Sequence, residues 1–233
     1  YLGAHVARVK AQGVQWALDR SAQDGLEPQY VAVLDADLTP DSDYYAAVIG
    51  RMEARRELGV ASGLVTSPGQ RQRQAVESFQ RTDLPRGGIQ VFRLACLLEI
   101  GGLPPYAGYD GIANVKAGLR GWHRQLFTDL VVEQVRPTAT RFGSFFGFRK
   151  KGRYAWSLGL NPALVLARTA AYPLRSPRRE GLAFILGWAE ARWTGPAPCP
   201  DEEVRQYYRW ERPQEYLRAA MDRVMGRDGE GFV

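Results

Sequence analysis

The sequence predicts an α/β fold, in which short apolar strands alternate with helices around a parallel or mixed sheet. Residues 30–34 form an apolar, β-branched run, which is typical of a buried strand. Residues 60–65 and 88–92 repeat this pattern, and helices are expected between the strands at 39–58, 94–100 and 111–119. Such alternation favours one sheet covered by helices.

Other elements follow from local signals along the chain. Small and apolar residues at helical spacing predict a helix over 5–22. Thr39-Pro40 predicts the start of the next helix, because proline is favoured at the first helical position. Residues 67–85 are polar and predict a long loop or lid. Residues 126–135 are expected to hold one or two short strands.

The composition changes after Val135, so we place a domain boundary near residue 140. Residues 1–140 form the predicted α/β domain, and residues 141–233 form a basic, helical C-terminal extension. No acidic residue occurs from Gln134 to Arg179, whereas ten Arg and Lys residues occur there among Phe, Tyr and Trp. Helices are expected at 144–158, 162–172 and 180–193, and another after the capping residue Asp201.

Charge and cysteine content narrow the class of protein. The net charge of +6 favours anionic partners such as nucleotides, acidic lipid surfaces or nucleic acid. No apolar run approaches the roughly 18 residues that span a bilayer. Cys96 and Cys199 lie far apart, without the spacing of a zinc site or disulfide framework, and are expected to be free thiols in a reducing compartment. Because the chain begins with Tyr1, we expect an N-terminal segment to be missing or trimmed.

Two carboxylates, Asp35 and Asp37, follow directly on the predicted strand 30–34. Ligands bind at the carboxyl ends of strands in open α/β sheets, and Mg²⁺ prefers one or two carboxylates together with phosphate oxygens. We therefore predict that both carboxylates face a cleft at the end of a central strand. There Asp37 would hold a divalent cation that stabilises a nucleoside diphosphate as the leaving group. The alternative is an acidic loop that caps the next helix.

Asp110 follows a loop rich in Gly and Pro and precedes the helix predicted at 111–119. Two roles are open for it, and they can coexist. It can cap the helix N-terminus, or it can act as a general base that takes a proton from an acceptor hydroxyl. We expect it to share the cleft of Asp35 and Asp37.

The order and spacing of these motifs resemble glycosyltransferase family 2 over about residues 1–140. The resemblance is carried by Leu34-Asp35-Ala36-Asp37, the run from Gly87 to Arg93, Ile100-Gly101-Gly102-Leu103, Asp110 and Gly121-Trp122. It implies a GT-A (Rossmann-like) fold that lacks its first strand, together with an inverting, metal-dependent sugar transfer. Residues 136–175 are similar to the tail of bacterial members that act at membranes.

The resemblance also implies roles for individual residues. Asp110 would be the catalytic base, Asp35 would contact the nucleoside, and Asp37 would bind Mg²⁺ or Mn²⁺. The remaining substrate-binding residues would be Gly87, Gly88, Gln90 and Arg136, and the two glycines would let the backbone approach the donor sugar.

Three features depart from the family pattern. The first strand and the nucleobase-binding loop would precede Tyr1. The acidic residue that usually precedes the base is replaced by Tyr109. A His that can serve as a metal ligand usually follows the last core strand, and here Glu133-Gln134-Val135 stand in its place.

We therefore expect an enzyme that moves a sugar from a nucleotide-diphosphate donor to a hydroxyl of a glycan or lipid-linked acceptor. The alternatives are a nucleotidyltransferase, which would release pyrophosphate, and a catalytically degenerate sugar-nucleotide-binding module. For residues 141–195 we expect peripheral contact with the inner face of the cell membrane, from the cytoplasm. A solvated helical face or nucleic-acid binding are the alternatives there, and no recognised nucleic-acid motif accompanies the charge.

Overall fold

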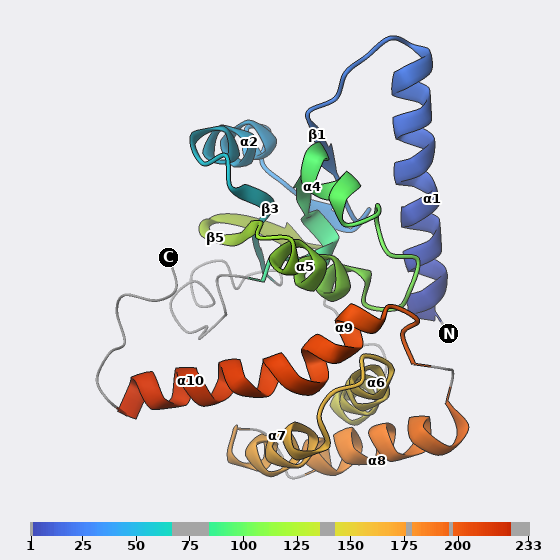
Figure 1. The fold of residues 1–233 in the computed structure, drawn as a ribbon, viewed down its shortest axis with the longest axis vertical. Coiled ribbons are helices and arrows are strands. Elements are labelled where there is room, and N and C mark those ends of the chain that lie inside the picture. Colours follow the sequence, from blue (N-terminus) through green and yellow to red (C-terminus); the bar gives the residue numbers. More distant parts are fainter. Residues whose placement is uncertain (1, 67–83, 136–142, 176–178, 196–197, 225–233) are drawn as a thin grey trace. The chain divides into compact units, whose positions relative to one another are not determined.

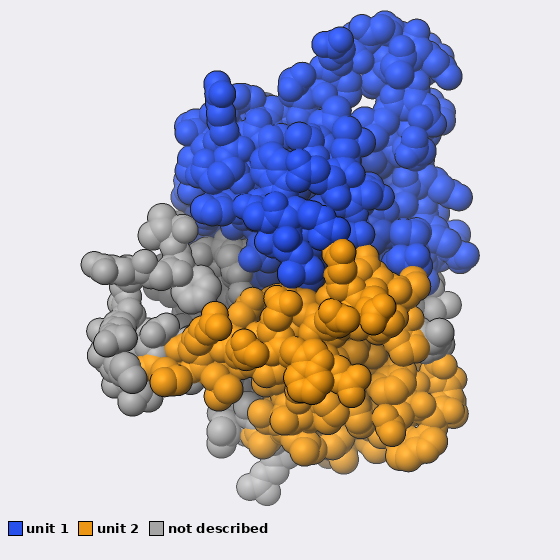
Figure 2. Space-filling model, in the orientation of Figure 1, with its two compact units in different colours: residues 1–137 blue, residues 138–233 orange. Residues whose placement is uncertain are grey.

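The computed structural model describes residues 2–66, 84–135, 143–175, 179–195 and 198–224 (Figure 1). The chain divides into two compact units, unit 1 (Tyr1–Pro137) and unit 2 (Thr138–Val233), which are coloured separately in Figure 2. Unit 1 contains a five-stranded sheet with helices, as predicted for a mixed α/β chain, and the described part of unit 2 is helical.

The sheet of unit 1 has the order β1-β4-β3-β5-β2 in the described residues. β3 and β5 pair in parallel, whereas the other three pairs are antiparallel. Eight of the nine residues of β3 are buried, as expected for a strand covered on both faces. The strands are β1 (Tyr30–Ala32), β2 (Leu38–Thr39), β3 (Leu58–Thr66), β4 (Val91–Arg93) and β5 (His123–Gln134).

Helices cover both faces of this sheet, and neighbouring residues of β4 enter opposite cores. Phe92 packs in one cluster with residues of α1, α4 and α5, whereas Val91 packs in another with residues of α2. This division follows from the alternation of side chains along a strand. The helices are α1 (Leu2–Gln23), α2 (Tyr44–Ala54), α4 (Leu94–Glu99) and α5 (Tyr109–Leu119) (Figure 1).

Three expectations for unit 1 are wrong. The strand before Asp35 is not central, because β1 pairs with β4 alone among the described strands. Thr39-Pro40 does not begin a helix: residues 38–39 form β2 against the end of β5, with Leu38 buried, and α2 begins at Tyr44. The third strand does not begin at Gly88, because Gly87–Ile89 form a 3₁₀ turn and β4 begins at Val91.

Unit 2 contains three helices that pack closely. They are α6 (Gly143–Ser157), α7 (Pro162–Arg175) and α8 (Arg179–Thr194), near the predicted positions. A Cβ on Gly152 would collide with the carbonyl oxygen of Phe184, and one on Gly187 would collide with that of Arg149. The backbones of α6 and α8 therefore touch where these glycines cross.

The C-terminal part of unit 2 comprises α9 (Glu202–Gln206), a π-helical turn (Tyr207–Glu211) and α10 (Arg212–Val224). Asp201 caps α9 as predicted, because its Oδ1 accepts a hydrogen bond from the backbone N–H of Val204 at 3.3 Å. Pro213 offers no N–H to the carbonyl of Arg209, and the Asn161 side chain donates to that oxygen at 2.8 Å instead.

The described part of the chain bears on two further expectations. Cys96 and Cys199 are free thiols, as predicted, and both are buried. No described helix combines the length and apolar character that a bilayer-spanning helix requires.

Candidate functional site

The Gly87-Gly88 pair brings two of the predicted carboxylates into one place. A Cβ on Gly87 would lie 2.5 Å from the Cβ of Asp110, and a Cβ on Gly88 would lie 2.8 Å from the Oδ2 of Asp35. The backbone N–H of Asp35 also donates to the carbonyl of Gly88 at 2.7 Å. The two carboxylates therefore occupy the spaces that side chains at 87 and 88 would fill, so glycine at both positions lets them lie against this turn (the di-glycine turn).

Asp110 lies in the first turn of α5 and does not cap it. Gly108 is the N-cap residue, with a φ of 77° that favours glycine. Burial raises the pKa of the Asp110 carboxyl. Hydrogen bonds from the backbone N–H groups of Gly111 and Asp110 itself, and the charges of Lys10 and Arg86, lower it in part. A carboxylate with a raised pKa is a better proton acceptor than an ordinary aspartate.

Lys10 of α1 links Asp35 to Tyr109 beside this turn. No motif in the sequence singles it out. Its Nζ forms an ion pair with Asp35 and donates a hydrogen bond to the Tyr109 hydroxyl at 2.6 Å. That hydroxyl in turn donates to the carbonyl of Gly87 at 2.5 Å. A signal was present, because Lys10 lies three residues after Ala7 and four before Val14, on the apolar face of the helix.

Asp37 is held by the end of β5, and its bonding partners differ from those of Asp35. Its Oδ2 accepts a hydrogen bond from the Gln134 side chain at 2.9 Å, and its carbonyl accepts one from the N–H of Val135 at 2.8 Å. Within Glu133-Gln134-Val135, Gln134 therefore bonds the carboxylate of the predicted metal ligand and Val135 bonds its backbone. From the sequence alone, this segment is visible only as a departure from the family pattern.

The side chains near Asp37 fit a cation that takes most of its ligands from a substrate. Within the described residues, no group of three or more His, Cys, Asp or Glu side chains is gathered to hold a metal. Asp37 supplies one carboxylate, whose Oδ2 already accepts a hydrogen bond from the Gln134 amide. Mg²⁺ is commonly bound by one or two carboxylates plus phosphate oxygens, so a single carboxylate suits Mg²⁺ or Mn²⁺ only together with a diphosphate.

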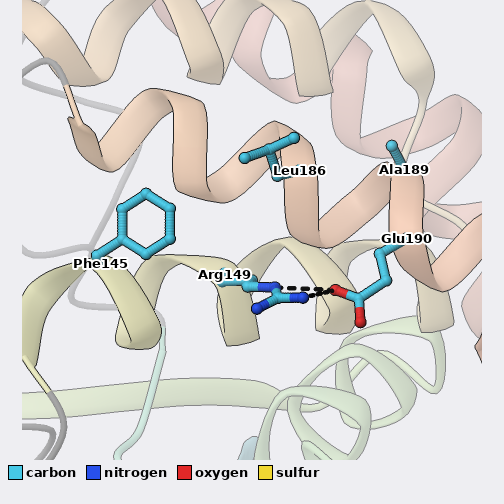
Figure 3. A pocket seen from close by; sticks show the side chains of 5 residues that line it. All are labelled: Phe145, Arg149, Leu186, Ala189 and Glu190. Atoms are coloured by element: carbon cyan, nitrogen blue, oxygen red, sulfur yellow. Dashed lines mark hydrogen bonds and ion pairs between the residues drawn. The ribbon is translucent and has the colours of Figure 1, made fainter.

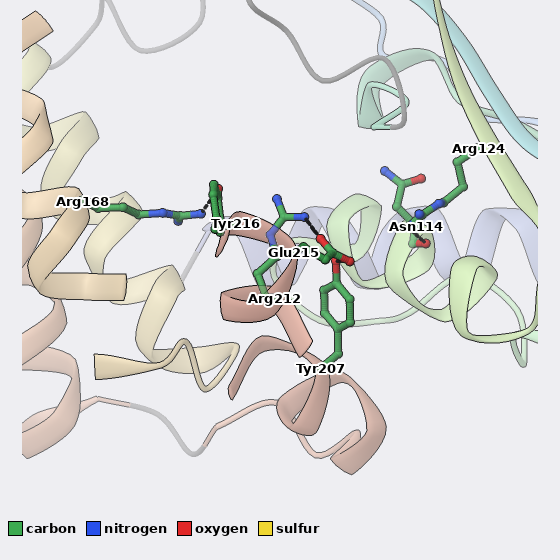
Figure 4. A network of polar contacts seen from close by, with 7 residues as sticks. All are labelled: Asn114, Arg124, Arg168, Tyr207, Arg212, Glu215 and Tyr216. Carbon is green, nitrogen blue, oxygen red and sulfur yellow. Dashed lines mark hydrogen bonds and ion pairs between the residues drawn. The ribbon is translucent and has the colours of Figure 1, made fainter. Parts of the chain in front are cut away.

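One other predicted substrate-binding residue, Gln90, does not join this site. Gln90 has no exposed surface, and its side-chain amide donates to the Oδ1 of Asn114 at 3.1 Å. Asn114 donates to the carbonyl of Pro85 at 3.1 Å and accepts at its own carbonyl from Arg124 (Figure 4). Gln90 therefore lies in the packing between β4 and α5, where a substrate does not reach. Arg136 and most of the predicted lid over 67–85 lie outside the described residues.

A second surface lies on unit 2, between α6 and α8. These helices enclose a hollow of about 400 Å³ lined by Phe145, Arg149, Leu186, Ala189 and Glu190 (Figure 3). Arg149 forms an ion pair with Glu190 at 2.8 Å, and Arg153 approaches the same carboxylate at 3.6 Å. Two cations of the acid-free stretch are therefore used in packing α6 against α8.

Two further cationic side chains of unit 2 are engaged in polar contacts with residues of α10. Arg212 is buried and bonds the carboxylate of Glu215 at 2.8 Å, and the hydroxyl of Tyr207 donates to the same carboxylate at 2.8 Å. Arg168 donates to the Tyr216 hydroxyl at 2.9 Å (Figure 4). These contacts give Arg168 and Arg212 a structural role within unit 2.

Comparison with known proteins gives likenesses among solved structures alone. No protein-family model and no curated protein matches the sequence. Among solved structures, the chain is similar to the mannosyltransferase PcManGT from Pyrobaculum calidifontis in complex with GDP-Man and Mn²⁺. The TM-score is 0.42, the sequence identity is 18%, and the match covers 90% of this chain and 66% of that one.

Proposed function

We propose that this chain is an inverting glycosyltransferase that moves a sugar from a nucleotide-diphosphate donor to a hydroxyl of a glycan or lipid-linked acceptor. The observation that supports it best is the pair of carboxylates on the di-glycine turn, one of them with a raised pKa. Because the turn has no side chains of its own, both carboxylates lie against its backbone, so a substrate held by Asp35 would lie close to Asp110.

In this proposal Asp110 is the general base. Its carboxylate takes the proton of the acceptor hydroxyl while that oxygen attacks the anomeric carbon of the donor sugar. The bond from the anomeric carbon to the diphosphate oxygen breaks at the same time, and its electrons leave with the nucleoside diphosphate. Attack from the face opposite the leaving group inverts the anomeric centre. General bases of this kind contribute roughly 10²- to 10⁴-fold in rate.

Asp35 and Asp37 have separate tasks in this proposal. Asp35 lies beside Gly88 and would accept a hydrogen bond from the nucleoside. Asp37, positioned by Gln134, would hold Mg²⁺ or Mn²⁺. When bound, such a cation offsets the negative charge of the diphosphate and so stabilises it as a leaving group.

Two observations favour a second candidate, a sugar-nucleotide-binding module without catalysis. Asp35 already has a cationic partner in Lys10, and the segment Glu133-Gln134-Val135, whose Gln134 donates to Asp37, stands where the family pattern has a His. The first lowers the negative charge near a metal ion, and the second leaves the site without the ligand that a His would supply. The two candidates differ in turnover and agree in donor binding, so one assay separates them.

The test is donor-dependent release of nucleoside diphosphate by the chain, with Mg²⁺ or Mn²⁺, over a panel of nucleotide sugars. We expect release with at least one donor, and Asp110→Asn should lower turnover by roughly 10² to 10⁴ with little change in donor binding. Release of pyrophosphate would identify a nucleotidyltransferase. Binding without turnover would identify the binding module, and equal rates for Asp110→Asn and wild type would remove Asp110 as the base.

We further propose that residues 141–195 contact an anionic membrane peripherally, at the cytoplasmic face. The support is the stripe of exposed apolar side chains on α8 (Leu182, Leu186 and Trp193), with Phe145 of α6 beside the same hollow and Lys150 exposed. Each Lys or Arg near an anionic surface contributes on the order of 1 kcal/mol.

Co-sedimentation with anionic and neutral liposomes, at low and high salt, tests this contact. Binding that needs anionic lipid and weakens with salt is expected, because the attraction fades within a Debye length. Trp193→Ser should weaken it, whereas Trp16→Ser, which changes an exposed tryptophan of α1, serves as the control. A chain that stays in the supernatant at low salt would leave α6 and α8 as a solvated face.

A further inference from the structure

We propose that Lys10 is a positioning residue of the candidate active site. Through one ion pair and one hydrogen bond it fixes Asp35, Tyr109 and the di-glycine turn, and thereby the place of Asp110. Its kinetic consequences rest on the proposed function, and four contacts within unit 1 support it.

The contacts form a closed path through four separate segments of the chain. Lys10 bonds Asp35 on one side and the Tyr109 hydroxyl on the other, at 2.6 Å. The Tyr109 hydroxyl donates to the carbonyl of Gly87 at 2.5 Å, and the carbonyl of Gly88 accepts from the N–H of Asp35 at 2.7 Å. The path returns to Asp35, so moving any one member disturbs the others.

Lys10 is held firmly enough to play this part. Its side chain is only 13% exposed, whereas that of Asp35 is 40% exposed. A covered ammonium group needs partners, and it has the carboxylate, the hydroxyl and the Tyr109 ring, whose centre lies 4.8 Å away. Ala7 and Ala11 pack α1 onto the core beside it, so the helix backbone does not yield easily.

Tyr109 takes part because its hydroxyl is a neutral donor. Burial raises the pKa of Tyr109, and the charges of Asp110 and Asp35 raise it further. The phenol therefore keeps its proton over the physiological pH range, and its O–H donates a hydrogen bond to the carbonyl oxygen of Gly87. This chain carries Tyr109 where the family pattern has an acidic residue. Here the hydroxyl of Tyr109, itself bonded by Lys10, holds the di-glycine turn through the carbonyl of Gly87.

Lys10 also acts on Asp110 through its charge. The charged groups that bear on Asp110 are Lys10 and Arg86, which both lower its pKa. Removing the charge of Lys10 should raise the pKa of Asp110 further. A general base works only when deprotonated, so the rate would then fall off at a higher pH than in the wild type.

The test compares Lys10→Met with Lys10→Arg and with Arg8→Met, a matched loss of charge at an exposed position of the same helix. Lys10→Met should lower kcat by about tenfold to 100-fold, as expected for a misplaced base, with a smaller change in KM. It should also move the acidic limb of kcat/KM to higher pH. Lys10→Arg should restore most of the rate, and Arg8→Met should match the wild type in both.

Two further measurements keep the inference testable if Lys10→Met folds poorly or the wild type shows no turnover. Tyr109→Phe keeps the packed ring, removes the bond to Gly87, and should lower kcat without moving the acidic limb. A ¹³C NMR titration of the Asp110 carboxyl reads its pKa directly, and that pKa should rise in Lys10→Met. Wild type without turnover would overturn the proposed function alone. Unchanged kcat in Lys10→Met and Tyr109→Phe, or an unchanged Asp110 pKa, would overturn the role of Lys10.

Discussion

Glycines have different partners in the two units of this chain. In unit 1, the missing side chains of Gly87 and Gly88 leave space that Asp110 and Asp35 occupy. In unit 2, the missing side chains of Gly152 and Gly187 leave space for the backbone of the opposite helix. Both units thus need glycine for close approach. One approach places carboxylates beside a turn, and the other packs α6 against α8.

The difference lies in what an added Cβ would have to displace. The carboxylate end of an Asp side chain can rotate away from an added Cβ, whereas the Cβ of that Asp cannot. A helix backbone can move away only if the whole helix shifts. We therefore expect the cost in stability to fall from the unit 2 glycines to Gly87 and then to Gly88. The cost in activity should be confined to the unit 1 pair.

The largest effect is expected for Gly187→Ala, whose Cβ would collide with the Arg149 carbonyl. The helices must move apart, which should cost about 3 kcal/mol of unfolding free energy, at the upper end for overpacking. Urea unfolding measures the loss, and amide hydrogen exchange should locate it in α6 and α8. Gly13→Ala in α1 is the control, because its Cβ meets nothing within 4 Å and should instead stabilise the helix by up to about 1 kcal/mol. Equal stability of Gly187→Ala and wild type would contradict the backbone contact.

Gly87→Ala should have the next largest effect, because its Cβ meets the Cβ of Asp110. We expect a loss of about 1 to 2 kcal/mol and a fall in turnover, since the base must shift. The Cβ of Gly88→Ala meets the carboxylate end of Asp35 and the end of the Leu38 side chain, so it should cost less stability. Urea unfolding and nucleoside diphosphate release measure the two effects. A larger loss of stability in Gly88→Ala than in Gly87→Ala would reverse the proposed order.

Asp110→Asn should change stability in the opposite direction. Burial raises the pKa of Asp110, so the folded state holds this proton more tightly than the unfolded chain does. The ionised carboxylate therefore destabilises the fold above the folded-state pKa, and this cost is absent below the unfolded pKa of about 3.9. The variant should melt slightly higher than wild type at pH 7, and the difference should fade as the pH falls below about 3.9. A variant that melts lower at pH 7 would show that the carboxylate stabilises the fold.

The smallest effect is expected for the ion pair that links α6 and α8. The Arg149 and Glu190 side chains are 43% and 29% exposed, so solvent screens their attraction. A double-mutant cycle of Arg149→Met and Glu190→Gln should give a coupling of about 0.5 kcal/mol. The proximity of Arg153 to the same carboxylate should reduce it further. A coupling above about 2 kcal/mol would mean that charge, rather than glycine contact, holds the two helices together.

The sequence determined the features that depend on neighbouring residues. Helices α5, α6, α7 and α8, the strand before Asp35 and the Asp201 cap lie near their predicted positions, because periodicity, caps and glycines act over a few residues. The apolar run of β3 likewise predicted a buried strand. Asp35, Asp37 and Asp110 could be chosen as candidate site residues because each follows a predicted strand or begins a predicted helix.

Only the tertiary structure decided which of these residues meet. Leu38 and Thr39 form a strand because β5 lies beside them, and this pairing overrides the helix signal of Pro40. Gln90 is interior because Asn114, 24 residues later, bonds it. Lys10 contacts Tyr109 across 99 residues of sequence, and no local pattern contains that separation. Contacts of this kind arise from packing α1 and α5 on the same core, so the positions of the carboxylates follow from the fold rather than from their motifs.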